Sequence, residues 1–357
     1  MLDPQTFHDV VSGRRRGFGA ALVRGGLRLG ALGYTLVVRA RNRCYDWGLV
    51  NVHRVAAPVV SVGNLTLGGT GKTPMVEWLA RWFQSRGVRI AVVSRGYGAE
   101  AGSPNDEALE LAQKLPGVPH FQDPDRVAAA RRAIEQSDCE VILLDDAFQH
   151  RRIARNLDLV LLDACDPFGY GRIFPRGTLR EPAAALRRAG VIVLSRADML
   201  EPARREPTWH RVRRIAPEAA CAEAAHVPVG VRSASGGTAS LDALLGKRVA
   251  AFCAIGNPAG FRHTLEHSGV RPAGWRVFPD HHRYTPADIQ ALAAWAERLE
   301  AAAAVCTHKD LVKVGADRLG SLPLWAVCVE FRFLSGQEAV EERLERLLAE
   351  SRQPDHS

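Results

Sequence analysis

The chain has 357 residues and a mass of 38.9 kDa, with 46% hydrophobic and 24% charged residues, a balance that excludes a disordered chain, a collagen and a multi-span membrane protein. Its seven cysteines include no Cys-x-x-Cys pair, so a reducing compartment fits better than a disulfide framework or a structural zinc site. The net charge of +8 is concentrated in residues 1–57, which hold nine arginines and three acids. A nucleic-acid-binding protein more often spreads its basic charge over the folded body, so no nucleic-acid partner is expected.

The N-terminal segment is basic and partly apolar. Its longest run without a charge is residues 29–38, whereas a membrane-spanning helix needs about twenty apolar residues. On a helix of 100° per residue, four arginines of segment 18–43 fall within an arc of about 100°; they are Arg24, Arg28, Arg39 and Arg43. Two interpretations stay open, a helix packed on its own domain and an interfacial helix whose arginines contact anionic headgroups.

A glycine-rich turn follows the first apolar run, residues 58–64. Residues 66–73 read Thr-Leu-Gly-Gly-Thr-Gly-Lys-Thr, and apolar residues at helical spacing begin at Met75. Strand, glycine-rich loop and helix are the context of a P-loop, although the strict motif has glycine at the position of Thr66. Backbone amides of the loop and of the helix start would bind phosphate oxygens; the predicted nucleotide-binding residues are Gly68, Gly69, Thr70, Gly71, Lys72 and Thr73. Lys72 would reach the β- and γ-phosphates and Thr73 would place its hydroxyl on Mg²⁺.

A second apolar run, residues 141–144, ends in Asp145 and Asp146, which is the form of a Walker B element. Further aliphatic runs at 90–94, 157–163 and 191–194 alternate with helical or loop stretches. This pattern predicts a parallel sheet covered by helices on both faces. Ligands of such sheets bind at the carboxyl ends of the strands, where residues 94–98, Asp145, Asp146 and Asp163 lie.

Several motifs together are more specific than a P-loop. They occupy residues 61–74, 94–98, 145–152, 168–172, 179–182, 255–258 and 278–284. In this order they resemble the tetraacyldisaccharide 4′-kinases of lipid A synthesis, over about residues 14–345. The resemblance implies transfer of the γ-phosphoryl group of ATP to the 4′-hydroxyl of an acylated glucosamine disaccharide 1-phosphate, which gives lipid IVA. It also implies a peripheral enzyme on the cytoplasmic face of the Gram-negative inner membrane, which favours the interfacial interpretation of segment 18–43 on an anionic membrane surface.

The resemblance also implies catalytic residues. Lys72 matches the lysine of the family's P-loop. The family's catalytic carboxylate lies in a Gly-Asp-Glu-Pro segment, which here reads Asn-Asp-Glu-Ala at 105–108, so Asp106 is the candidate base. Its partner is a histidine of the Asp-His-His motif, either His281 or His282, with His281 slightly favoured. A carboxylate positioned by a histidine suits the chemistry, because a sugar hydroxyl must lose its proton to attack phosphorus.

The predicted magnesium site also rests on the resemblance. Thr73 matches the family's magnesium-binding threonine, Asp145 and Asp146 match its magnesium-associated pair, and Glu181 matches the acid of its Leu-Arg-Glu-Pro motif. The family's Thr-Glu-Lys-Asp segment reads Thr-His-Lys-Asp at 307–310, and His308 is given no role. The expected cofactors are therefore ATP and Mg²⁺.

We expect an α/β protein with a P-loop NTPase-like parallel sheet, a second, smaller α/β domain and an N-terminal membrane-surface helix. The predicted regions are a basic helix at 1–50, a P-loop domain at 51–232, a linker at 233–240 and a smaller domain at 241–357. In the smaller domain we expect strands at 249–255, 303–307 and 324–331 and helices at 286–299 and 338–350. Asp106 and the two histidines would then come from different domains.

Two other classes of protein remain possible on the residues alone. A switch nucleotidase would use the same loop, and residues 195–198, Ser-Arg-Ala-Asp, faintly resemble the guanine-reading Asn-Lys-x-Asp motif. A purely structural membrane-associated protein would leave the P-loop unexplained. No obligate protein partner is inferred, and the compound that stimulates nucleotide turnover, a glycolipid or a protein, separates the enzyme from the switch.

Overall fold

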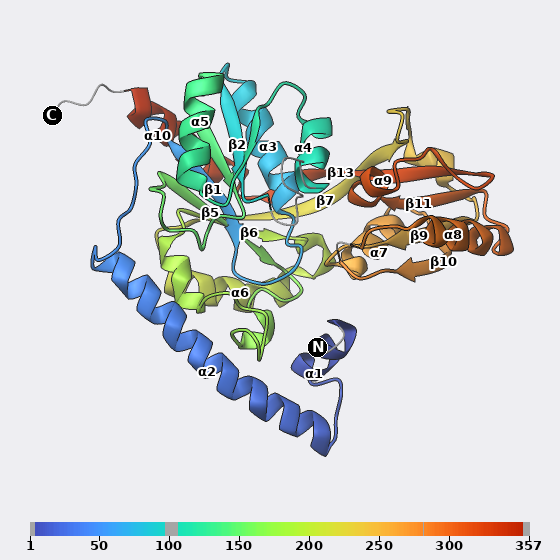
Figure 1. Ribbon diagram of the computed structural model, residues 1–357, viewed down its shortest axis with the longest axis horizontal. Coiled ribbons are helices and arrows are strands. Elements are labelled where there is room, and N and C mark those ends of the chain that lie inside the picture. Colours follow the sequence, from blue (N-terminus) through green and yellow to red (C-terminus); the bar gives the residue numbers. More distant parts are fainter. Residues whose placement is uncertain (1–3, 97–105, 281, 353–357) are drawn as a thin grey trace. The chain divides into compact units, whose positions relative to one another are not determined.

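The structure is a computed structural model that describes residues 4–96, 106–280 and 282–352 (Figure 1). The chain forms two compact units. The larger unit comprises residues 1–96, 117–225 and 333–357, and the smaller comprises residues 97–116 and 226–332. Each unit therefore contains segments that are distant in the sequence.

The larger unit is built on a parallel sheet with the strand order β7-β6-β5-β1-β4-β2-β3. The strands are β1 (Val59–Asn64), β2 (Ile90–Ser94), β3 (His120–Gln122), β4 (Val141–Asp145), β5 (Leu157–Asp163), β6 (Val191–Ser195) and β7 (Ala220–Arg232). Every residue of β1, β2, β4 and β6 is buried, as the continuous aliphatic runs predict for a sheet covered on both faces.

Helices of the larger unit pack on this sheet and form at least two cores with it. Trp209 and Val212 of α6 join Val160 and Ile192 in one core, and the alanines of α5 pack on β1, β2 and β4 in another. The elements are α3 (Lys72–Gln84), α5 (Arg126–Ser137), α6 (Pro202–Ile215), α10 (Gln337–Arg352) and the short helices η1 (Gly169–Gly171), η2 (Ala183–Arg188) and η3 (Ala197–Met199). The predicted P-loop-type sheet with covering helices is confirmed.

Two helices precede the sheet, α1 (Pro4–Ser12) and α2 (Phe18–Asp46). α2 runs without interruption through Gly25, Gly26, Gly30 and Gly33, although glycines weaken isolated helices. It is the one helix, within the part of the chain that the structure describes, that is long and apolar enough to cross a membrane by length and composition. With 29 residues, α2 is much longer than the charge-free run at residues 29–38.

The smaller unit has its own parallel strands in the order β10-β9-β11-β13. Its strands are β8 (Thr238–Ala239), β9 (Val249–Cys253), β10 (Pro272–Val277), β11 (Ala303–Thr307), β12 (Arg318–Leu319) and β13 (Leu322–Ser335), the last of which runs on into the larger unit. Its helices are α4 (Asp106–Lys114), η4 (Leu241–Leu244), α7 (Pro258–His267), α8 (Pro286–Arg298) and α9 (His308–Val314). Phe252, Leu292 and Leu324 are fully buried in one of its cores.

Chain order and compact units differ in three places. Residues 233–240 form the turn and short strand β8 that pairs back on β7, and their role as a linker stays a prediction. α10 belongs with the larger unit, and α4 belongs with the smaller one, where it packs on α9. Asp106, at the start of α4, thus shares a unit with the Asp-His-His segment.

Candidate active site

The glycine-rich loop connects the end of β1 to the start of α3. Gly68 has φ 106° and Gly71 has φ 86°, a backbone region that side chains other than glycine rarely adopt. The Asn64 amide donates to the Thr66 carbonyl oxygen at 2.9 Å and fixes the first bend. Gly71 caps α3 without a side chain, so the amides of the first turn of α3 are left to bind an anion.

The last residue of β6 and the residue after it donate hydrogen bonds to carbonyl oxygens of the loop. The Ser195 hydroxyl donates to the Thr70 carbonyl oxygen at 2.8 Å. The Arg196 guanidinium donates to the Gly69 carbonyl oxygen at 2.8 Å and forms an ion pair with Asp163 at the end of β5. The segment that faintly resembled a guanine-reading motif therefore contacts the loop backbone.

Asp146 contacts three basic side chains beside the loop. The Lys72 Nζ atom lies 3.6 Å from Oδ1 of Asp146, and Arg180 Nη1 lies 2.8 and 3.0 Å from its two oxygens. Arg126 donates to the Asp146 carbonyl oxygen at 3.3 Å. Burial raises the pKa of the Asp146 carboxyl, but Lys72 and Arg180 outweigh burial and hold the pKa below its usual value. Three cations around one carboxylate leave a surplus of positive charge, which suits the phosphates of a nucleotide.

Asp145 and Thr73 carry side-chain oxygen atoms and are the sequence neighbours of Asp146 and Lys72 in this cluster. Asp145 is the last residue of β4 and is only 3% exposed, while Thr73 lies in the first turn of α3. Among the described residues, no three His, Cys, Asp or Glu side chains gather into a metal-binding group. Mg²⁺ needs no such group, because it is commonly held by one or two carboxylates together with substrate phosphates and water. A hydroxyl and a carboxylate therefore fit the ion by donor type.

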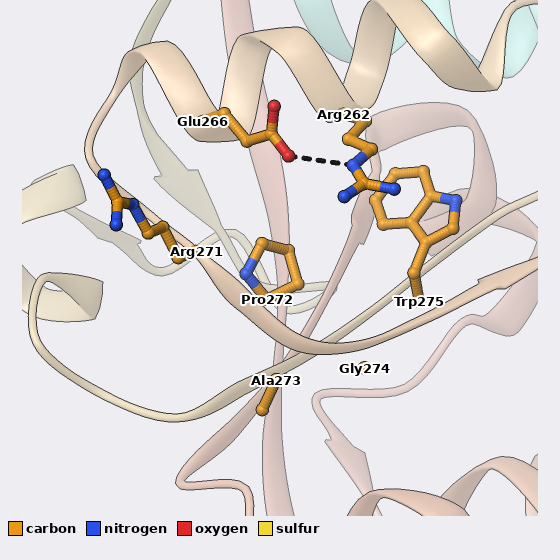
Figure 2. A pocket seen from close by; sticks show the side chains of 7 residues that line it. All are labelled: Arg262, Glu266, Arg271, Pro272, Ala273, Gly274 and Trp275. Atoms are coloured by element: carbon orange, nitrogen blue, oxygen red, sulfur yellow. Dashed lines mark hydrogen bonds and ion pairs between the residues drawn. The ribbon is translucent and has the colours of Figure 1, made fainter.

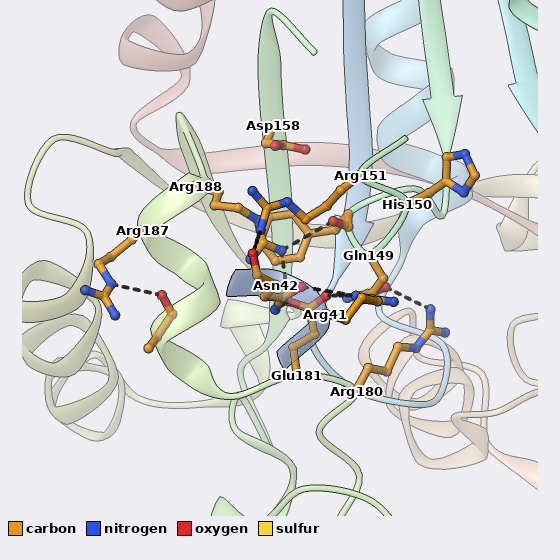
Figure 3. Close-up of polar contacts among 12 residues, drawn as sticks. Arg41, Asn42, Gln149, His150, Arg151, Asp158, Arg180, Glu181, Arg187 and Arg188 are labelled. Atoms are coloured by element: carbon orange, nitrogen blue, oxygen red, sulfur yellow. Dashed lines mark hydrogen bonds and ion pairs between the residues drawn. The ribbon is translucent and has the colours of Figure 1, made fainter. Parts of the chain in front are cut away.

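Glu181 has a different environment. Its side chain is fully buried, with Oε1 3.0 Å from Arg41 and Oε2 3.1 Å from Asn42 and 2.9 Å from Arg188 (Figure 3). Protein donors thus engage both oxygens, and the contact fastens α2 to the larger unit. The predicted role of Glu181 as a magnesium ligand stays a prediction, and this geometry does not support it.

The predicted base and its histidine partner are described only in part. Asp106 is the first residue of α4, its side chain lies outside the described residues, and so does His281. His282 is described: Nε2 lies 3.1 Å from Oδ2 of Asp288, and the ring stacks on Phe278 with centroids 4.8 Å apart. Asp288 also closes the capping box of α8, so His282 is held at the start of that helix.

α4 is fixed within the smaller unit by a buried polar cluster. His308 Nε2 and Gln113 Oε1 lie 2.9 Å apart, and Lys114 pairs with Glu110 at 2.9 Å. Burial lowers the pKa of His308 from 6.5 to about 4, against the opposing effect of Glu110, so the imidazole is neutral near pH 7. His308, for which no role was predicted, therefore contacts the helix that begins at Asp106.

Comparison with known proteins decides the family. A sequence profile described as tetraacyldisaccharide-1-P 4′-kinase matches residues 26–349. The chain belongs to the tetraacyldisaccharide 4′-kinase family. It is 40% identical to the tetraacyldisaccharide 4′-kinase of Anaeromyxobacter sp. (strain K), over 94% of this chain and 93% of that protein. It is 36% identical to that of Geobacter sulfurreducens, over 96% and 98% of the two chains.

A solved structure of the same family has the same fold. LpxK from Aquifex aeolicus, crystallised in complex with ATP, superposes with a TM-score of 0.71 at 26% identity, over 91% of this chain and 99% of that one. Membership of the family confirms the resemblance predicted from the order of the motifs. No motif predicted the positions of Arg126 and Arg180, although Arg180 lies inside the Leu-Arg-Glu-Pro motif. Ser195 and Arg196 belong to the segment that faintly resembled a guanine-reading motif, and their contacts with the loop were not predicted.

Proposed function

We propose that this chain transfers the γ-phosphoryl group of ATP to the 4′-hydroxyl of a tetraacylated glucosamine disaccharide 1-phosphate. The observation that carries the proposal is the cluster of Lys72, Asp146 and Arg180 beside a glycine-rich loop whose α3 amides are uncapped. That arrangement suits phosphoryl transfer, in which catalysis consists mainly of positioning and of stabilising negative charge. Membership of the kinase family supports the acceptor.

The nucleotide site follows from this cluster. The loop amides at Gly68–Thr73 bind phosphate oxygens, and Lys72 places its charge on the β- and γ-phosphates. Lys72 is already paired with Asp146, the residue that follows β4. This ion pair would hold the lysine side chain in place for the phosphates. Ser195 and Arg196 hold the carbonyl side of the loop and thereby aim its amides at the nucleotide.

Mg²⁺ is the second proposed cofactor. Thr73 and Asp145 would hold it, because both offer the hard oxygen donors that the ion prefers. When bound, the ion neutralises charge on the transferred phosphate. Asp146 contributes to the same site through its contacts with Lys72 and Arg180.

The proposed base is Asp106, and its proposed partner is His281 or His282. The carboxylate accepts the proton of the 4′-hydroxyl as that oxygen attacks phosphorus. The match to the family's acidic segment supports this role, as does the cluster of His308, Gln113 and Glu110 that fixes the helix beginning at Asp106. His282 already contacts Asp288. Separate substitutions of His281 and His282 would identify the partner of Asp106.

The proposed location is the cytoplasmic face of the bacterial inner membrane. α2 exposes large apolar side chains, among them Phe18 (81% exposed) and Leu29 (72%), while Arg41 and Asn42 near its C-terminal end are fastened to Glu181. A helix fixed at one end and apolar along an exposed face can enter the interface of a bilayer that contains the acylated acceptor. ATP and the anionic lipid surface would meet on the cytoplasmic side.

The proposal is tested by ATP turnover with and without the disaccharide 1-phosphate. We expect ADP formation to depend on the acceptor, with one phosphate entering the lipid for each ADP. ATP hydrolysis to inorganic phosphate at the same rate with or without acceptor would instead support a switch nucleotidase.

A further inference from the structure

A basic groove lies between the C-terminal part of α2 and the short helix η2. Its volume is about 500 Å³, and Arg39 and Arg43 line it from α2 while Arg187 and Arg188 line it from η2. One acid, Asp46, also lines the groove, and it is paired with Arg151 at 2.8 Å. The groove therefore presents several guanidinium groups and little available negative charge.

Three of these arginines lack an acidic partner. Arg188 is paired with Glu181 at 2.9 Å, but no carboxylate among the described residues lies within ion-pair distance of Arg39, Arg43 or Arg187. Within the part of the chain that the structure describes, the acceptor of Arg187 is the Ala184 carbonyl oxygen, at 3.3 Å. Like charges gathered around one groove attract an anion, and the planar guanidinium fork matches a phosphate group in shape.

A second pocket, about 620 Å³ beside β10, shows the contrast. There Arg262 lies 2.8 Å from Glu266, and Trp275 lines the pocket beside them (Figure 2). Arg262 already has its counter-charge inside the pocket, and Arg271 is the other arginine that lines it. The groove at α2 is the stronger candidate for an anionic ligand.

The walls of the groove are held in place. Asn42 donates to Glu181 at 3.1 Å, and Arg151 donates to the Asn42 carbonyl oxygen at 3.0 Å. Figure 3 shows Arg41 and Asn42 of α2 meeting Glu181 and Arg188 from the other wall. Because these contacts fix α2 against η2, the arginines need little rearrangement to bind a ligand.

The same face of α2 continues as an apolar stripe. At 100° per residue, Arg39 and Arg43 share a sector of about 80° with Leu29, Leu32 and Leu36. Leu32 is 63% exposed and Leu36 is 68% exposed. The exposed face thus changes from apolar to cationic within two turns, and this order matches a lipid with its acyl chains on one side and its phosphate on the other.

We propose that this groove binds the phosphate of an anionic membrane phospholipid through Arg39, Arg43 and Arg187, while the acyl chains lie along Leu32 and Leu36. The inference rests on the proposed function only because an acylated acceptor brings the protein to a bilayer. The groove would select anionic lipid, and the apolar stripe would provide insertion. Arg24, whose guanidinium donates to the Arg15 carbonyl oxygen at 2.9 Å, lies outside this site.

The test measures partition of the full chain onto vesicles of phosphatidylcholine, with and without phosphatidylglycerol. The variant Arg39→Gln/Arg43→Gln removes two groove charges, and Arg14→Gln/Arg28→Gln removes two charges from the same N-terminal region outside the groove. At about fivefold per basic residue, we expect the groove variant to lose about 25-fold of its partition onto anionic vesicles. The control should lose less than about fivefold, because Arg14 and Arg28 do not line the groove, and salt screens the attraction of an exposed arginine that makes no direct contact with a lipid phosphate.

Arg187→Gln keeps the test valid if the α2 variant fails to fold, because Arg187 lies on the opposite wall. This variant should lose about fivefold of its partition. Equal losses in the two double variants, or no loss in Arg187→Gln, would show that only overall charge matters and would overturn the proposal. Release from vesicles by millimolar inorganic phosphate would show a free-phosphate site and would overturn it as well. Failure of the kinase proposal would appear separately, as no phosphorylation of the acceptor by the unaltered chain.

Discussion

Arg196 gives a sharp test of how the nucleotide loop is held. Its side chain is only 8% exposed, it is paired with Asp163, and it donates to the Gly69 carbonyl oxygen at 2.8 Å. The substitution Arg196→Ala removes this charged donor without touching the amides that face the nucleotide. The loop should then populate other conformations, and ATP must select the competent one at a cost in affinity.

The size of the effect follows from the contacts. A hydrogen bond to a charged group contributes about 1.5–3 kcal/mol, which corresponds to about 10- to 100-fold in an equilibrium constant. Ser195 still holds the Thr70 carbonyl oxygen in this variant, so we expect the lower end. The KM for ATP should rise about tenfold, while the KM for the lipid acceptor stays unchanged.

Arg205→Ala is the matched control. Arg205 is 11% exposed and pairs with Glu223, which is 16% exposed, the same exposure as Asp163. Its loss should reduce stability to a similar degree but leave the KM for ATP unchanged. Steady-state kinetics with each substrate varied, together with thermal unfolding, separates the two effects. Equal KM values for ATP in both variants would refute the idea that Arg196 positions the loop.

Three further predictions concern the catalytic groups and pH. Lys72→Ala should lower kcat by about 10²–10³, the usual effect of losing a donor to transition-state charge, with an unchanged circular dichroism spectrum; near-normal turnover would exclude the nucleotide role. Asp106→Asn should lower lipid phosphorylation by about 10² or more while ATP affinity, measured by titration calorimetry, stays within a few-fold; a large loss of ATP binding would make Asp106 a nucleotide or magnesium ligand. Because the pKa of His308 is about 4 when folded and 6.5 when free, the unfolded chain binds more protons between these values and stability falls as pH drops. His308→Gln should therefore reduce the loss of stability between pH 6.5 and 4 by about 3 kcal/mol, and identical denaturation curves for the two proteins across this range would contradict the burial argument.

The local signals of the nucleotide loop and the sheet are strong in the sequence. Continuous aliphatic runs predicted strands such as β1 and β4 because a parallel strand buried on both faces has no polar side to show. The glycines before Lys72 predicted the loop because a backbone with positive φ favours glycine. Gly68 and Gly71 have positive φ in the structure. These features depend on residues close together in the chain.

Long-range contacts were beyond the sequence pattern. Arg196 and Gly69 are 127 residues apart, and Arg41 and Glu181 are 140 apart, so no local spacing could pair them. The position of α4 depends on its packing against α9 through His308 and Gln113, and chain order alone assigned it to the other domain. Four glycines suggested a weak α2, yet its contacts with Glu181 and Arg180 support it as tertiary contacts support most protein helices.

The most direct test of the central claim is the position of the transferred phosphate. The unaltered chain, ATP and Mg²⁺ are incubated with tetraacyldisaccharide 1-phosphate or with the analogue that has hydrogen in place of the 4′-hydroxyl, and the lipids are examined by mass spectrometry and ³¹P NMR. The account predicts one added phosphate monoester at the 4′-oxygen of the natural acceptor and none on the analogue. Phosphorylation of the analogue, or ATP consumption without a change in either lipid, would contradict it.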